Sequence, residues 1–223
     1  MIEQNQYLGP LEAFGGLRAE FNRYADIIEF TKDAYPFSSD DSLEWFYVIV
    51  SGKIKVYDIN FETNREQTLY MLVRGDMFDV VTLLDNSLHE LAIDVLEAGQ
   101  AIRFPIVKVR EWMQSNAGFS QVIYKYVAKQ IRDVESLATD ISLLETKDRL
   151  LKLLLRNKDY IDKRGINLLE SLSHSEIASL IGTVRHIIDR HLKDLKNKKI
   201  IDKEKKSIIL KDASKVLEML KSL

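Results

Sequence analysis

The stretch HSEIASLIGTVRHIIDRHLKDLKNKK, residues 174–199, contains two segments of helical apolar spacing that meet at one glycine, Gly182. Ser173 precedes the stretch and Glu176 follows three residues later, which is the spacing of a capping box at a helix start. A small residue, Ala178, lies four positions before the glycine, where a second helix would cross closely. Two short helices joined by a tight glycine turn predict a helix-turn-helix, and an ordinary αα-hairpin is the alternative.

The second helix is expected to begin at Thr183, a favourable N-cap residue, and to run to about Asn197. The apolar residues that recur at helical spacing, and should face the core, are Ile188, Leu192 and Leu195. A helix with its polar face outward fits the major groove, with its N-terminal half on base edges. The DNA contacts expected from the helix pair are Ser173, Ser175, Thr183, Arg185, His186, Asp189 and Arg190.

Residues 200–210 (IIDKEKKSIIL) follow the second helix and predict a β-hairpin. The tip of this hairpin is expected to carry Lys203, Glu204, Lys205 and Lys206. A strand pair after a helix-turn-helix makes a winged variant, and Lys205 is expected to contact DNA phosphates.

The charge of the chain is unevenly distributed. Residues 145–223 hold 19 Lys and Arg against 12 Asp and Glu, whereas residues 1–144 hold 13 against 22. An acidic front and a basic back indicate two modules with different partners. The basic module suits a polyanion such as DNA, and a solvated lysine-rich surface is the alternative.

The front of the chain predicts several short strands with turns between them. Residues 43–57 are expected to form two strands on either side of a Ser51-Gly52 turn, and residues 66–78 another strand that ends at Gly75-Asp76. Two more strands are expected at 91–96 and 100–104, separated by the turn Glu97-Ala98-Gly99. Short strands at this spacing are typical of an antiparallel sandwich or roll.

The pattern then changes to helices. Residues 119–144 predict one long helix, 145–161 an amphipathic helix, and 166–169 a short strand. In the long helix, positions at coiled-coil spacing are Ile123, Val127, Gln130, Val134, Leu137, Ile141 and Leu144. This seam predicts a parallel homodimer, with Gln130 fixing the register, and a helix buried inside one chain is the alternative. A second stripe, Phe119, Val122 and Tyr126, is expected to pack on the preceding sheet.

The composition narrows the class of protein. The chain has no cysteine, which excludes disulfides, thiolate catalysis and cysteine-bound iron–sulfur or zinc sites. No apolar run approaches the roughly 20 residues that cross a bilayer, and the first residues (MIEQNQYLGPLEAFGG) lack the features of a secretory signal. We therefore expect a cytoplasmic protein without a membrane partner. No nucleophile–base pair, metal-ligand spacing or phosphate-binding loop indicates an enzyme.

The order of roll, long helix and winged helix-turn-helix resembles the Crp/Fnr family of bacterial transcription regulators. SEIASLIGTVRHIIDRHLKDL (175–195) is similar to the family pattern E-I-A-x-x-x-G-x-S-R-E-T-V-x-R-x-L. WFYVIVSGKIKVY (45–57) is similar to the hallmark of its sensor roll, and Gly75-Asp76-Met77-Phe78 to its G-D-x-F piece. The resemblance implies that Arg185 and Arg190 read bases. His186 stands where the family has glutamate, which favours guanine over the usual cytosine at that base and puts the usual half-site in doubt.

The resemblance also bears on the effector. Members that bind cyclic AMP cradle its phosphate with G-E-L and a downstream R-S, whereas this chain has Asp79-Val80-Val81 and Glu90-Leu91. Two carboxylates in place of an arginine clamp would repel a cyclic phosphate, so cyclic AMP is not expected. Some relatives bind haem, and His89, the sole histidine of the sensor, is the candidate ligand; a solvated loop histidine is the alternative. The effector is otherwise unknown, and no metal site is expected.

We therefore expect an α+β chain with a β-roll sensor at 1–118, a dimerisation helix at 119–144 and a winged helix-turn-helix domain at 145–223. The favoured function is a homodimeric regulator that binds an inverted-repeat operator in double-stranded DNA, with RNA polymerase as a possible further partner. The alternative is a non-catalytic ligand-binding or scaffold protein whose basic end docks an acidic protein. DNA binding should weaken steeply with salt yet keep a sequence preference, which distinguishes the two.

Overall fold

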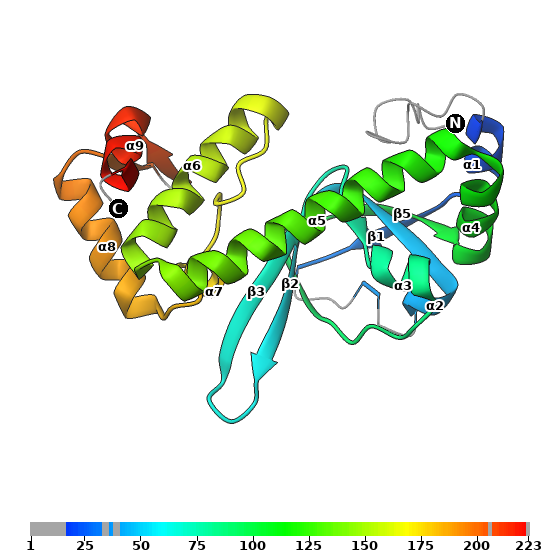
Figure 1. Ribbon diagram of the computed structural model, residues 1–223, viewed down its shortest axis with the longest axis horizontal. Coiled ribbons are helices and arrows are strands. Elements are labelled where there is room, and N and C mark those ends of the chain that lie inside the picture. Colours follow the sequence, from blue (N-terminus) through cyan, green and yellow to red (C-terminus); the bar gives the residue numbers. More distant parts are fainter. Residues whose placement is uncertain (1–16, 33–35, 38–40, 205–206, 222–223) are drawn as a thin grey trace. The chain divides into compact units, whose positions relative to one another are not determined.

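Figure 1 shows the computed structural model of the chain, which describes residues 17–32, 36–37, 41–204 and 207–221. The chain divides into two compact units. The first unit comprises Met1–Tyr57 and Tyr70–Asp133, and the second comprises Asp58–Leu69 and Val134–Leu223. The division of the chain into 1–118, 119–144 and 145–223 stays a prediction.

The elements from the start of the chain to the long helix are a sheet with short helices around it. In chain order they are α1 (Arg18–Tyr24), β1 (Asp26–Phe30), α2 (Asp41–Glu44), β2 (Trp45–Asn60), β3 (Arg65–Leu72), β4 (Met77–Phe78), α3 (Val80–Asp85), β5 (Ala92–Pro105), α4 (Ile106–Ser115) and α5 (Ala117–Leu143). The strand order in the sheet is β1-β5-β2-β3, with β4 on β2, and β5 runs antiparallel to both β1 and β2. The predicted antiparallel roll is confirmed.

The two turns expected at Ser51-Gly52 and at Glu97-Ala98-Gly99 are wrong. β2 and β5 each run unbroken through these residues, and the pairing between them shifts register there. Gly52 has φ +88°, and a Cβ on it would lie 2.7 Å from the carbonyl oxygen of Glu97. A Cβ on Gly99 would lie 2.1 Å from the carbonyl oxygen of Ser51. The glycines therefore let two long strands approach at a bulge, which the sequence alone does not distinguish from a turn.

The N-terminal part of α5 belongs to the core of the first unit. Phe119 is 1% exposed, and its ring lies 6.1 Å from that of Trp112. Val122 and Tyr126 pack against the same cluster. The hydroxyl of Tyr126 donates to the carbonyl of Met77 at 3.0 Å and accepts from its amide at 2.9 Å. The predicted packing of this stripe on the sheet is confirmed.

The second unit is a helical module with a two-stranded sheet. Besides the end of α5 and residues 58–69 of the β2–β3 hairpin, its elements are α6 (Thr146–Arg164), α7 (His174–Leu180), α8 (Arg185–Asn197), β6 (Ile201–Glu204), β7 (Ser207–Leu210) and α9 (Ala213–Lys221). The antiparallel β6–β7 pair is the predicted wing. Helix α9, which buries Val216, was not expected.

The strand expected at 166–169 is wrong. α6 ends at Arg164, its C-cap Gly165 adopts φ +66°, and the chain then forms a turn. Leu169 is buried in that turn, where its amide donates to the Oδ1 atoms of Asn157 and Asn167. Leu168 and Leu169 are therefore buried without a strand partner, and side-chain amides satisfy the backbone N–H of Leu169.

Candidate functional site

The helix pair α7–α8 forms through local contacts that the sequence indicates. Ser173 accepts a hydrogen bond from the amide of Glu176 at 3.2 Å, and the Glu176 carboxylate accepts from the amide of Ser173. The predicted capping box is confirmed. Gly182 adopts φ +67°, which favours glycine, and the amide of Thr183 donates to the carbonyl of Ala178 at 3.0 Å. Ala178 is 2% exposed, as a close helix crossing requires.

The second helix begins close to Thr183, as expected, but the prediction of Thr183 as its N-cap is wrong by one residue. Val184 is the N-cap of α8, with extended φ −120°, and it has no side-chain acceptor. The amide of Thr183 is still closing the turn onto Ala178, so the chain enters helical geometry only after Val184. The first amides of α8 consequently lack a side-chain cap, which leaves them suited to a phosphate oxygen.

Helix α8 has one buried face and one exposed face. Ile188, Leu192 and Leu195 are at most 7% exposed and pack in the core of the second unit. Arg185, His186, Asp189 and Arg190 are all exposed, and the side chain of Arg185 is 72% exposed. The exposed face begins at the first residue of the helix. This arrangement can present two guanidinium groups and an imidazole to a groove in DNA.

Two of the expected DNA contacts, Asp189 and Ser173, also interact with other residues of the helix pair. The Asp189 carboxylate pairs with Nδ1 of His174 and lies 3.7 Å from Nε of Arg185. Asp189 therefore orients α7 and α8 toward each other within the pair. Ser173 and Ser175 are exposed at the start of α7, with the Ser173 hydroxyl engaged in the capping box. Lys205 and Lys206 lie outside the described residues.

A partly buried histidine lies on the inner side of α8. Nε2 of His191 lies 2.9 Å from Oγ1 of Thr146, which begins α6. Burial lowers the pKa of His191 below its ordinary value, and the positive charges of Arg190 and Lys147 lower it further. His191 is thus a packed side chain between α6 and α8 rather than part of the exposed face.

The β2–β3 hairpin contributes residues that sequence reasoning missed. Oγ1 of Thr68 lies 2.8 Å from Oγ of Ser179, and both side chains are buried. Nε2 of Gln67 donates to the carbonyl of Ser179 at 3.0 Å. These contacts join residues 111 or 112 positions apart in the chain, so no periodicity or local motif could indicate them.

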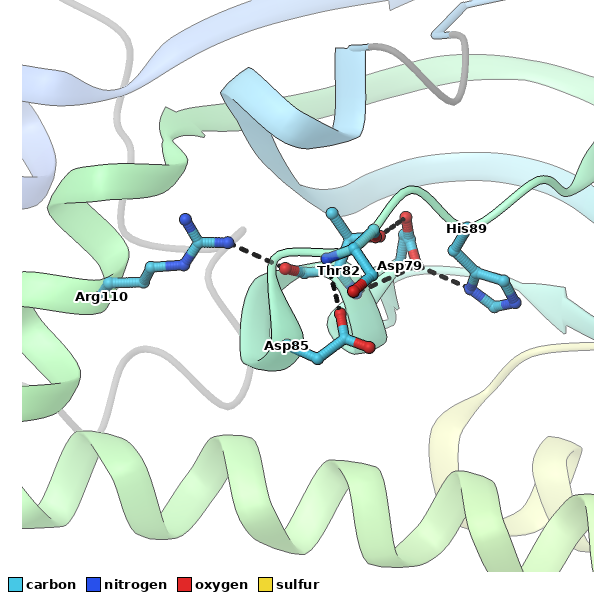
Figure 2. Close-up of polar contacts among 6 residues, drawn as sticks. Asp79, Thr82, Asp85, His89 and Arg110 are labelled. Carbon is cyan, nitrogen blue, oxygen red and sulfur yellow. Dashed lines mark hydrogen bonds and ion pairs between the residues drawn. The ribbon is translucent and has the colours of Figure 1, made fainter.

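In the first unit, Asp79 stands at the start of α3 (Figure 2), and it is 4% exposed. Its carboxylate accepts from Oγ1 of Thr82 at 2.7 Å and lies 3.0 Å from Nδ1 of His89. Arg110 lies across α3, where it donates to the carbonyls of Thr82 and Leu83 at 2.8 and 3.0 Å. A buried carboxylate of the chain itself therefore occupies the N-terminus of α3, where a helix favours negative charge.

This carboxylate also affects a neighbouring tyrosine. Burial raises the pKa of Tyr70, and the negative charge of Asp79 raises it further. The side chain of His89 is 36% exposed, and it contacts the buried side chain of Asp79. Asp79, Thr82 and His89 form one polar cluster, which we call the α3 cluster.

The predicted seam of α5 needs a correction. Ile123 is fully buried in the first unit, and Nε2 of Gln130 donates to the hydroxyl of Tyr126 at 3.4 Å. The exposed apolar stripe keeps Val134 and Ile141 of the predicted seam, and in its first half it lies one residue further along the helix. Its large members are Tyr124, Ile131, Val134 and Ile141, which are 55%, 53%, 41% and 40% exposed. The spacing of 3 and 7 residues still fits a heptad pattern.

The described part of the chain holds neither a metal-site cluster nor a membrane-spanning helix. No cluster of three or more His, Asp or Glu side chains there has the arrangement of a metal site. None of the described helices is both long and apolar enough to cross a bilayer.

Comparisons with known proteins follow the same division of the chain. A model of the cyclic nucleotide-binding domain matches residues 27–116, and a model of the Crp-like helix-turn-helix domain matches residues 148–219. The chain is 28% identical over 187 residues to the global nitrogen regulator of Nostoc sp., covering 80% of this chain and 82% of that protein. It is 21% identical over 192 residues to a CRP-like cAMP-activated global transcriptional regulator of Mycobacterium tuberculosis, covering 85% of each.

A solved structure shows the same fold. FixK2 from Bradyrhizobium japonicum is similar with a TM-score of 0.76 at 18% identity, covering 87% of this chain and 96% of that chain.

Proposed function

The chain belongs to the Crp/Fnr family of transcription regulators, and we propose that it binds an inverted-repeat operator as a homodimer, with α8 of each copy in a major groove. The family is one of DNA-binding regulators with an effector-binding domain, so the DNA-binding function itself follows from membership. We propose no catalytic activity. RNA polymerase as a further partner, and the cytoplasm as the location, stay predictions.

The observation that carries this proposal is the two-faced helix α8. Its apolar residues are buried in the second unit, so that its polar face is the one left for a partner. Arg185 and Arg190 supply planar donors that match the acceptor edge of guanine, and His186 supplies a further donor. We assign Ser173, Ser175, Thr183 and Lys205 to phosphate contacts that position the helix. Asp189 is assigned to orienting Arg185, through the pairing described above.

The exposed stripe of α5 supports the dimer. A stripe of Tyr124, Ile131, Val134 and Ile141 leaves four large apolar side chains in water in a single chain. Pairing of two α5 helices would bury these side chains at coiled-coil spacing. Two-fold symmetry then places two α8 helices on half-sites about one helical turn apart.

The α3 cluster argues against cyclic AMP as the effector. A phosphate bound at the N-terminus of α3 would approach Asp79, a buried carboxylate that already accepts from Thr82. Repulsion between the two anions in a buried place is costly, since water screens it poorly there. We therefore propose that the effector of this sensor does not place a phosphate at α3.

Haem does not fit the residues around His89 well. His89 is the candidate ligand, and the Asp79 carboxylate at Nδ1 would orient its ring for ligation through Nε2. However, the side chain of His89 is 36% exposed, and the neighbour that it contacts is the polar carboxylate of Asp79. An absorption spectrum of freshly purified protein tests this point: we expect no Soret band, and a Soret band that disappears in His89→Ala would contradict it.

The proposed function is tested by operator selection followed by a salt titration. We expect the full chain to enrich one sequence from random duplexes, and its affinity for that sequence to fall linearly with salt on logarithmic axes. A scrambled duplex should show a similar salt slope at a lower affinity. If an acidic protein were the partner instead, the chain would enrich no sequence.

A further inference from the structure

A cavity of about 230 Å³ lies in the second unit, between the end of α5, the first half of α6 and the end of α7. Three cationic side chains of α6 line it: Arg149, Lys152 and Arg156. Asp140 is the only acidic residue among the described residues that line the cavity, and it pairs with Lys152. The cavity therefore carries an excess of positive charge.

Among the residues that line the cavity, Arg149 has buried nitrogen atoms without a hydrogen-bond acceptor. Its Nε and Nη1 atoms are buried and have no hydrogen-bond partner. Burial also lowers the pKa of Arg149 below its usual value, with the charge of Asp140 acting in the opposite direction. A guanidinium whose buried nitrogen atoms lack an acceptor is destabilising, whereas one that meets a carboxylate or phosphate forms strong charge-assisted bonds.

Arg149 lies at the turn of the helix pair. A Cβ on Gly182 would meet Nη1 of Arg149 at 3.2 Å, so the guanidinium lies against the backbone of that turn. Ile181, the residue before Gly182, also lines the cavity. An anion held by Arg149 would thus contact α5, α6 and the turn between α7 and α8.

Apart from Ser136, the remaining described residues that line the cavity are apolar. Leu137 of α5, Leu153 of α6 and Leu180 of α7 contribute to this apolar lining. The volume lies just below the range of about 300–1,000 Å³ that is typical of pockets for drug-sized ligands. The occupant is therefore small, with a charged end at Arg149 and a short apolar body against the leucines.

We infer that this cavity is a second ligand site, which binds a small organic oxyanion, a carboxylate or a phosphate with a short apolar body, through Arg149, Lys152 and Arg156. The site uses other residues than the α3 cluster and the exposed face of α8. It goes beyond the proposed function and does not depend on DNA recognition.

Thermal unfolding and calorimetry of the full chain test the site, with acetate, butyrate and orthophosphate as probes at one ionic strength. A ligand that binds only the folded chain raises the unfolding temperature as its concentration rises. We expect butyrate to raise it more than acetate, because the longer chain contacts the leucines. Orthophosphate shows whether a phosphate head binds Arg149 as well as a carboxylate does.

Three variants identify the residues responsible. Arg149→Met should weaken butyrate binding about ten- to hundredfold, since it removes the charge-assisted bonds. Arg132→Met removes an exposed arginine of α5 that does not line the cavity, and it should bind as the original chain does. Lys152→Met, at a side chain that is 43% exposed, should also weaken binding and tests the site even if Arg149→Met fails to fold.

The inference is overturned if none of the probes shifts the unfolding temperature of the original chain. It is also overturned if Lys152→Met and a folded Arg149→Met bind butyrate as Arg132→Met does, which would indicate binding to dispersed surface charge. Loss of DNA binding in any variant does not bear on it, because the readout is binding of the anion.

Discussion

Replacement of Arg185 by alanine should separate DNA recognition from stability. The Arg185 side chain is 72% exposed, and its Nε lies 3.7 Å from Asp189, which is itself 47% exposed. An ion pair so open to water contributes little, so Arg185→Ala should change the free energy of unfolding by about 0.5 kcal/mol or less. A lost guanidinium contact to a base should cost about 1–3 kcal/mol of binding, or roughly 5- to 150-fold in affinity.

Fluorescence anisotropy with the selected operator and a scrambled duplex measures this effect. We expect Arg185→Ala to weaken operator binding more than scrambled binding, with relaxed preference at one symmetric pair of positions. Arg132→Ala is the matched control, since Arg132 is exposed on α5 outside the helix pair. Equal weakening on both duplexes would show that Arg185 contacts phosphate, and unchanged binding would refute its place in the interface.

Three further predictions follow from other parts of the chain. Ile188→Ala, at a fully buried position of α8, should lower the free energy of unfolding by about 2–5 kcal/mol in urea titrations, and a loss below about 1 kcal/mol would contradict the packing. Ile131→Glu should yield monomers in analytical ultracentrifugation, while Arg132→Glu, one residue off the stripe, should remain dimeric. The lowered pKa of His191 means that its contribution to stability is present above about pH 6.5 and is lost as pH falls through the folded-state pKa. His191→Gln keeps a partner for Thr146, so the unfolding free energy of this variant should decline less between neutral and acidic pH, and an identical pH profile would exclude the assignment.

Helices and caps could be predicted because their determinants are local. The capping box at Ser173 and the burial of Ile188 follow from residues three or four positions apart. The start of α8 was missed by one residue because the turn consumes the amide of Thr183, which depends on the geometry of Gly182 rather than on N-cap preference. An error of one residue changes which side chain is expected to cap the helix.

Long-range packing decided the features that the sequence did not indicate. The glycines at Gly52 and Gly99 carry the same signal in a turn and in a bulge, and only the pairing of β2 with β5 distinguishes them. The first half of the α5 seam differs by one residue from the prediction because Ile123 is held in the core of the first unit, whereas Val134 and Ile141 are exposed as expected. Arg149 follows an ordinary amphipathic pattern in the sequence, so the lack of partners for its buried Nε and Nη1 atoms is visible only in the folded chain.

Some features of the α3 cluster could be predicted from the sequence, and others could not. The substitution of Asp79 for a phosphate-binding glycine was visible in the sequence, as was the isolation of His89. The distance of 3.0 Å between Asp79 and Nδ1 of His89, and the hydrogen bond that Thr82 donates to Asp79, are visible only in the folded chain. At the N-terminus of α3, the negative charge is therefore supplied by Asp79 of the chain itself.

Two copies of α8 should read DNA together, and the sequence that the full chain enriches from random duplexes will show whether they do. We expect an inverted repeat whose half-site centres lie about 10–10.5 base pairs apart. Enrichment of a single asymmetric site, or of no sequence at all, would contradict the account.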